Sequence, residues 1–284
     1  MPLSSLSFRS TSDPAEATTW FADLVAAEPV RMSVIASVTH GLAGDPGRYE
    51  DPRWWAGTDT SGRVVAAFMR TPPFPLHVAV ATEPQAAALA ERLAEQGFSV
   101  PGVGGRRRPV EAFCDAWVRL TGGAARTVME LGVFELPVSP RVPFAVSGHY
   151  RQAHEDEQDL VSRWAQDFAD AVHDPTATPR PAPRLDSHVA AGRVGFWVDG
   201  GTPVSMAYAS AANGGVTRVS GVWTPPALRG RGYASGLVAA LSGERMEAGE
   251  RCMLFTDLSN PTSNKIYAAI GYRRIGDDIE VELG

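Results

Sequence analysis

The sequence predicts an α/β protein with a mixed sheet, made of two related units in tandem. Segments with the period of strands alternate with segments with the period of helices along its 284 residues, which is typical of α/β architectures. Both halves run through a similar order of strands and helices, although no residue-level repeat is visible. Prolines near residues 137–143 indicate a linker. We therefore expect domains at residues 1–140 and 141–284.

The composition excludes several classes of protein. The 44% of hydrophobic and 20% of charged residues are those of an ordinary globular protein. The net charge of −6 argues against nucleic-acid binding, which needs clustered Lys and Arg to neutralise phosphates. No apolar signal segment, no run of about 18 apolar residues and no metal-ligand spacing is visible. We expect a cytoplasmic protein without a membrane partner, with Cys114 and Cys252 reduced and buried.

The first half is expected to begin with a helix that Asp13 caps and Pro14 opens, continuing to about Leu42. An Ala-rich helix follows later, opened by Pro84 and closed by Gly97. The other elements expected in this half are two short strands within 54–67, a strand over 76–82, a short strand over 98–103, a Gly/Arg loop, a helix over 109–120 and a strand over 126–138.

In the second half, apolar residues at helical spacing predict a helix over 155–172. The segment 174–184 is rich in proline and predicts an extended loop. The other elements expected here are a strand within 144–152, a hairpin of 195–198 with 203–211, strands over 215–223 and 252–257, helices over 231–248 and 261–270, and a final strand over 272–283.

The stretch 217–241 is the most informative part of the chain. It predicts a strand, a turn at Pro225 and Pro226, an Arg/Gly-rich loop and then an apolar helix. Such a loop directs successive backbone N–H groups toward one point at the N-terminus of the helix, where the helix dipole is positive. Gly230 and Gly232 permit the backbone angles and the close approach that this needs. The sequence therefore predicts a binding site for a phosphate or pyrophosphate.

Two motifs carry a resemblance to a known family. The segment Arg229–Ala234 (R-G-R-G-Y-A) fits the pattern [Q/R]-x-x-G-x-[G/A], and residues 254–277 read L-F-T-D-L-S-N-P-T-S-N-K-I-Y-A-A-I-G-Y-R-R-I-G-D. Together they resemble the acetyl-CoA-binding core of the GNAT N-acetyltransferase superfamily, over residues 217–277. The first half is similar to that family only in the order of its elements.

The resemblance implies a cofactor, acetyl-CoA, and a role for each matching residue. Backbone N–H groups of residues 230–234 would hold the pyrophosphate, while Val222 and Thr224 would bind the pantetheine arm. The N–H of Val222 would also stabilise the carbonyl oxygen, and Tyr267 would protonate the departing thiolate. The predicted catalytic residues are Tyr267 and Val222, and the predicted cofactor-binding residues are Val222, Thr224, Arg229, Gly230, Arg231, Gly232, Tyr233, Ala234, Asn260 and Asn264.

Several of these residues have structural alternatives. Tyr267 and Tyr233 could pack as ordinary aromatic residues, Asn260 could only cap the helix after it, and Asp257 could face the substrate or cap a turn. No residue fits a motif for the general base. The histidines His149, His154, His173 and His188 are expected to be ordinary surface or loop residues.

The resemblance implies an N-acetyltransferase that moves an acetyl group to a primary amine by direct attack in a ternary complex, because no cysteine is placed to form a covalent intermediate. The acceptor would be a small molecule or a peptide, and the protein a monomer or a homodimer. The first half, in which a helix follows Thr82 within two residues, would be a degenerate copy without the phosphate loop. The alternatives are a non-catalytic acyl-CoA sensor, transfer of a longer acyl group or to a sugar-linked amine, and a structural protein with a chance Arg/Gly loop.

Overall fold

Residues 6–142, 144–172 and 181–284 are described by the computed structural model. Their contacts divide the chain into two units, Met1–Leu131 together with Gly276–Gly284, and Gly132–Ile275. The second unit thus begins at residue 132 rather than at the expected 141, and the last residues of the chain belong to the first unit. His173 and most of the predicted Pro-rich loop lie outside the described residues.

The first unit is a sheet with two helices on each face. Strands β1 to β5 lie side by side in chain order, with β4 and β5 parallel and the other pairs antiparallel. Because alternate residues of a strand face opposite ways, Trp54 packs with α1 and α2 while Trp55 packs with α3 and α4. The elements of this unit are β1 (Ser7–Thr11), α1 (Pro14–Ala27), α2 (Pro29–Gly44), β2 (Arg53–Thr58), β3 (Val64–Arg70), β4 (Leu76–Val80), α3 (Glu83–Glu95), β5 (Gly102–Arg106), α4 (Arg107–Thr121) and the first part of β6 (Ala125–Leu136).

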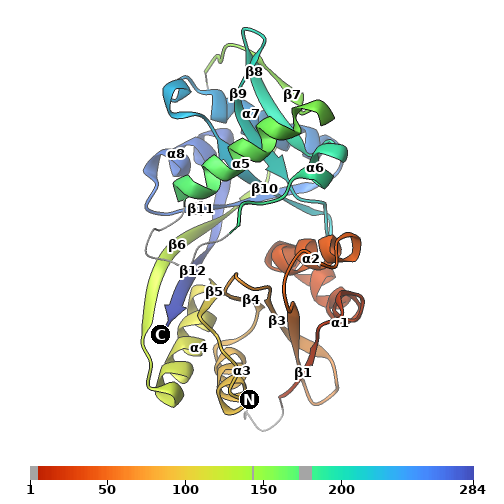
Figure 1. Ribbon diagram of the computed structural model, residues 1–284, viewed down its shortest axis with the longest axis vertical. Coiled ribbons are helices and arrows are strands. Elements are labelled where there is room, and N and C mark those ends of the chain that lie inside the picture. Colours follow the sequence, from red (N-terminus) through yellow and green to blue (C-terminus); the bar gives the residue numbers. More distant parts are fainter. Residues whose placement is uncertain (1–5, 143, 173–180) are drawn as a thin grey trace. The chain divides into compact units, whose positions relative to one another are not determined.

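The second unit has the same architecture. Strands β7 to β11 again lie side by side in chain order, and β10 and β11 are the parallel pair. Helices α5 and α6 cover one face of this sheet, and α7 and α8 cover the other (Figure 1). Its elements are β7 (His149–Gln152), a 3-10 turn (Glu155–Glu157), α5 (Gln158–Val172), α6 (Asp186–Ala190), β8 (Val194–Asp199), β9 (Thr202–Ala209), β10 (Val216–Trp223), a second 3-10 turn (Pro226–Leu228), α7 (Tyr233–Glu247), β11 (Arg251–Asp257), α8 (Pro261–Ile270) and the first part of β12 (Arg273–Leu283).

The tandem arrangement predicted from the sequence is confirmed. Each half of the chain runs strand, two helices, three strands, helix, strand, helix, strand. The closing strand β12 pairs antiparallel with β5, with Asp278 opposite Arg106 and Glu282 opposite Gly102. This pairing explains why residues 276–284 belong to the first unit, and it could not be read from chain order.

Two local expectations were wrong. The helix expected to run to Leu42 breaks at Glu28, because Pro29 cannot continue α1 and instead opens α2. The glycine-rich stretch after residue 101 is the strand β5 rather than a loop. A Cβ atom at Gly105 would lie 2.3 Å from the carbonyl oxygen of Val78, so glycine is what allows β5 to lie against β4. Neither α6 nor β1 was among the elements expected from the sequence.

Both cysteines are buried and unpaired, as expected. Within the described ranges, none of the helices has the length and apolar character needed to cross a bilayer.

Candidate functional site

The parallel strands β10 and β11 are hydrogen-bonded only near their N-terminal ends. The pairing of β10 with β11 covers residues 216–218 and 251–253. Beyond it, β10 continues to Trp223 and β11 to Asp257. In the part of the chain that the structure describes, the end of β10 is therefore held by β9 alone, which leaves backbone groups on its β11 side available to a ligand.

A β-bulge lies near the end of β10. The register with β9 shifts between residues 220 and 223, so that Gly221 and Val222 both stand opposite Ala207. Gly221 has φ +59°, a left-handed conformation that glycine adopts without strain. The half-buried side chain of Val222 packs against the cluster of α7 and α8 that contains Tyr267. The structure thus brings the two predicted catalytic residues into one cluster.

The residues after the bulge are fixed by internal hydrogen bonds. The hydroxyl of Ser205 donates to the carbonyl of Trp223 at 2.9 Å and lies 2.8 Å from the hydroxyl of Thr224. Since Ser205 has one proton to give, Thr224 is the donor in the second bond. Arg229 donates from Nε to the carbonyl of Thr224 at 2.9 Å, and its guanidinium lies 5.0 Å from the centre of the Trp223 ring. The side chain of Arg229 therefore braces the turn.

The predicted glycines occupy the conformations that require glycine. Gly230 and Gly232 have φ +78° and +83°, and Gly232 is the residue before α7. The N–H of Gly236 makes the first intrahelical bond, to the carbonyl of Gly232 at 3.0 Å. The N–H groups of residues 233–235 precede that bond and point out of the end of the helix. With the exposed Arg231 beside them, these residues fit an anionic group such as a pyrophosphate.

The start of α7 is anchored by a carboxylate that the sequence analysis missed. The buried Tyr233 donates from its hydroxyl to Asp199 at the end of β8 across 2.5 Å, and Ser147 donates to the same oxygen across 3.0 Å. These two bonds, chiefly the one from Tyr233, hold the pKa of Asp199 below its ordinary value. Arg231 contributes in the same direction through its charge. The side chain of Tyr233 is thus structural, while its N–H belongs to the helix end.

Tyr267 lies on α8 and is 8% exposed. Its ring meets that of Tyr272 edge to face, with 6.1 Å between the ring centres. Burial raises the pKa of Tyr267 to about 12, so the phenol is protonated at neutral pH. Among the described residues its hydroxyl has no hydrogen-bond partner, whereas the hydroxyl of Tyr272 lies 2.8 Å from that of Ser242. Tyr267 can therefore give a proton to a bound molecule.

The two asparagines of the second motif differ in what they do. The side chain of Asn260 accepts from the N–H of Ser263 at 3.1 Å and caps α8. Asn264 donates from Nδ2 to the carbonyls of Asp257 and Leu258 at 3.2 and 3.3 Å, which fixes the end of β11. Its buried Oδ1 has no partner among the described residues and remains a candidate acceptor for a ligand. The carboxylate of Asp257 accepts from Ser259 within a turn, as its alternative role predicted.

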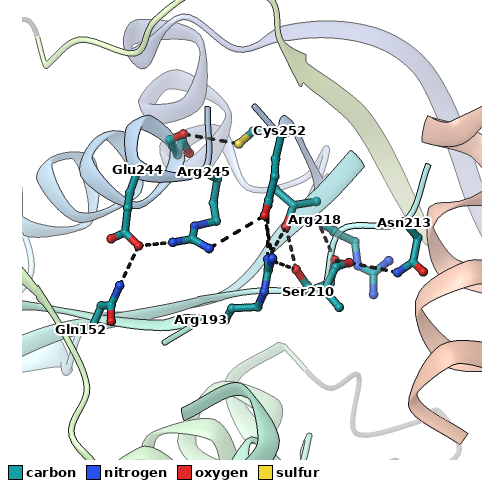
Figure 2. Close-up of polar contacts among 12 residues, drawn as sticks. Gln152, Arg193, Ser210, Asn213, Arg218, Glu244, Arg245 and Cys252 are labelled. Carbon is teal, nitrogen blue, oxygen red and sulfur yellow. Dashed lines mark hydrogen bonds and ion pairs between the residues drawn. The ribbon is translucent and has the colours of Figure 1, made fainter. Parts of the chain in front are cut away.

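The opposite end of α7 is held by a network of ion pairs (Figure 2). Arg193 donates to both carboxylate oxygens of Glu250, at 2.6 and 3.3 Å, and to the carbonyl of Ser210 at 2.6 Å. Arg245 pairs with Glu244, whose carboxylate also accepts from Gln152 at 2.7 Å. α7 is thus fixed to the sheet at both of its ends.

The corresponding helix of the first unit begins differently. Two residues separate the end of β4 from the start of α3, and Gln85 in the first turn of α3 accepts from the N–H of Thr82 at 2.8 Å. Glu83 adds a negative charge at the same helix end. The glycine-rich loop that precedes α7 has no counterpart in this part of the first unit, as the sequence analysis expected.

The turn before α7 was predicted from the sequence, but the residues on β8 and β9 that support it were not. Asp199, Ser205 and Tyr208 lie on β8 and β9, and only the pairing of the strands brings them to the end of β10. The only signal in the sequence was the D-G-G-T turn at Asp199, which places that carboxylate at the end of a strand.

Comparison with known proteins agrees with this geometry. Residues 194–281 match the family model described as FR47-like protein, and a search of curated proteins finds no match. A Drosophila protein of known crystal structure is 15% identical, with a TM-score of 0.67 over 98% of both chains. A GCN5-related N-acetyltransferase from Sphaerobacter thermophilus is 16% identical, with a TM-score of 0.61 over 96% of this chain and 94% of its own.

A tandem GNAT protein from the clavulanic acid biosynthesis pathway is 14% identical, with a TM-score of 0.58 over 98% of both chains. Because two GNAT copies in one chain reproduce the present fold over nearly its whole length, the likeness extends to the tandem arrangement itself. The chain therefore has the tandem GNAT fold, and its residues 194–281 match the FR47-like family model.

Proposed function

We propose that the second unit is an acetyl-CoA-dependent N-acetyltransferase that transfers an acetyl group to a primary amine. The observation that carries the proposal is the bulged end of β10, which leads through the Gly230 and Gly232 turn into the N-terminus of α7. A strand with available backbone groups, followed by a helix end that fits an anion, suits a long ligand that carries a pyrophosphate.

Each residue of the site then has a chemical task. Acetyl-CoA supplies the thioester whose acetyl group is transferred. The N–H of Val222 donates to the carbonyl oxygen as it gains negative charge, a contribution worth about 3–4 kcal/mol in other enzymes. Tyr267 gives its proton to the sulfur as the carbon–sulfur bond breaks. The amine nitrogen forms the new bond to the acetyl carbon, and its surplus proton passes to water.

The test is a calorimetric titration of acetyl-CoA into the wild type and a matched pair of variants at Gly230. A Cβ at Gly230 meets nothing within 4 Å, and both Asn and Asp tolerate its left-handed conformation better than other residues. Gly232 is less suitable, because a Cβ there would lie 2.6 Å from the ring of Phe144. Gly230→Asp and Gly230→Asn therefore differ chiefly in charge.

We expect the wild type and Gly230→Asn to bind with a Kd on the order of 1–10 μM, and Gly230→Asp to bind at least about tenfold more weakly because its carboxylate opposes the pyrophosphate. Failure of the wild type to bind would overturn the proposal. Binding without acetylation of any amine would instead support the non-catalytic sensor, and tighter binding of a longer acyl-CoA would support transfer of that group.

A further inference from the structure

An aromatic side chain lies across the bulge on the face of the sheet that α5 and α6 cover. Tyr208, in β9, is the partner of Ser220. A Cβ atom at Gly221 would lie 2.3 Å from Cε1 of Tyr208 and 3.5 Å from Cζ. These atoms belong to one edge of the ring, so that edge lies against Gly221. Because Cζ carries the hydroxyl, the polar end of the ring lies beside the bulge.

A second aromatic side chain holds that ring. The imidazole of His188, on α6, meets the ring of Tyr208 edge to face, with 5.5 Å between the centres and 77° between the planes. The segment that carries His188 is fixed, because the buried Val189 packs in the core beneath α5 and the carbonyl of His188 accepts from the N–H of Arg193 at 2.8 Å. The imidazole therefore restricts how Tyr208 can turn.

The side chains near the bulge lie on opposite faces of the sheet. Val222 and Tyr267 belong to the cluster on the α7 and α8 face, so the group that protonates the leaving sulfur lies on that side. Tyr208 packs against the cluster on the α5 and α6 face. An acceptor that approaches the acetyl carbon from the side away from Tyr267 meets Tyr208.

We propose, on the basis of the proposed function, that Tyr208 binds and orients the acceptor amine and that His188 is a positioning residue for Tyr208. The phenol oxygen accepts a hydrogen bond from the amine nitrogen, and the ring face attracts the ammonium form before it loses its proton. The acceptor is then an amine recognised by contact with an aromatic ring.

The test is steady-state acetylation of phenethylamine, glycinamide, spermidine and glucosamine, with release of the coenzyme A thiol as the readout. Tyr208→Phe keeps the ring and removes the hydroxyl. Loss of a hydrogen bond to a charged group should raise the KM of the amine about tenfold and leave the Kd of acetyl-CoA unchanged. Tyr150→Phe, which removes a hydroxyl from β7 on the other face of the sheet, should change neither constant.

His188 is tested by rescue. His188→Ala should raise the KM of the amine, whereas His188→Phe, which keeps an aromatic edge against Tyr208, should restore it to near the wild-type value. If His188 were needed only for folding, both variants would lower Tm, and His188→Phe would not restore the KM of the amine.

The outcomes separate this inference from the proposed function. If acetyl-CoA binds and an amine is acetylated, but Tyr208→Phe leaves the KM of that amine within twofold of the wild type, the role of Tyr208 is overturned and the acetyltransferase stands. If none of the four amines is acetylated, the proposed function and this inference fail together.

Discussion

The hydroxyl of Tyr233 and the carboxylate of Asp199 are 2.5 Å apart, which joins the first residue of α7 to the last residue of β8. The bond fixes the helix end at the point where its N–H groups are unpaired within the helix. A site made of backbone groups depends on such anchors, because it has no side chain of its own to adjust. The precision of the predicted pyrophosphate site thus rests on Asp199.

Tyr233→Phe should lower the Tm of the second unit by about 3 °C, because the ring remains packed while Asp199 loses its shortest hydrogen bond. Tyr49→Phe is the matched control: Tyr49 contacts Phe74 through its ring, so the loss of its hydroxyl should leave Tm unchanged. Scanning calorimetry of the three proteins makes the comparison. Equal Tm values for Tyr233→Phe and the wild type would contradict the anchoring role.

The pH dependence of this effect has a definite sign. The pKa of Asp199 is held below its ordinary value of 3.8, so its contribution to stability is present above that value and is lost as pH falls through the lower, folded value. The Tm difference between the wild type and Tyr233→Phe should therefore be the same at pH 7 and pH 5. If the Tm difference were smaller at pH 5 than at pH 7, Asp199 would already be taking up a proton between these values, and its pKa in the folded protein would not be lowered.

Tyr267→Phe should lower kcat by about 100-fold or more, the range typical of a lost general acid. The Kd of acetyl-CoA and Tm should change little, because the hydroxyl has no partner among the described residues. Because the pKa of Tyr267 is about 12, this residue should stay protonated through pH 10. Stopped assays of the wild type and the variant from pH 6 to 10 test both points; a kcat within threefold of the wild type would exclude Tyr267 as the acid.

The turn before α7 could be predicted because its signals are local. Pro225, Gly230 and Gly232 each restrict or free the backbone at their own position, and the structure places all three in the turn. Asp199 could not be predicted, since it lies 34 residues from Tyr233 in the sequence and their contact depends on where β8 ends. The contact of His188 with Tyr208 could not be predicted for the same reason, because the short helix α6 lacks a clear sequence signal and the contact is a tertiary one.

The strand β5 shows a different limit. Its glycines were interpreted as a loop, because glycine weakens a strand and usually marks a turn. In the structure these glycines allow β4 and β12 to lie close to β5 on its two sides. Gly105 faces the carbonyl of Val78 in β4, and Gly102 faces the carbonyl of Val281 in β12. Local propensity is overridden here by contacts with strands distant in the sequence.

One molecule of acetyl-CoA should bind per chain. The start of α3 is occupied by the Thr82 and Gln85 contact and by the charge of Glu83, and β4 and β5 approach closely at Gly105. These features oppose an anion and a pantetheine arm in the first unit. Calorimetry should give a stoichiometry near one in the wild type, and Gly230→Asp should remove that single event; a second binding event that survives in this variant would contradict the prediction.

Arg193→Met should destabilise the second unit by about 3–5 kcal/mol, the range typical of a buried ion pair that loses one partner. The side chains of Arg193 and Glu250 are 16% and 12% exposed. The substitution removes the bidentate partner of the Glu250 carboxylate and one of the donors to the carbonyl of Ser210 (Figure 2).

Two further variants separate the ion pair from general packing. The double variant Arg193→Met with Glu250→Met should be less destabilised than Arg193→Met alone, because no uncompensated charge remains buried. Arg251→Met breaks the more exposed pair with Glu135, in which the arginine side chain is 53% exposed, and should cost less than about 1 kcal/mol. Urea unfolding gives the three free energies. If the double variant proved less stable than the single one, Arg193 would matter for its hydrophobic stem or its bond to Ser210 rather than for its charge partner.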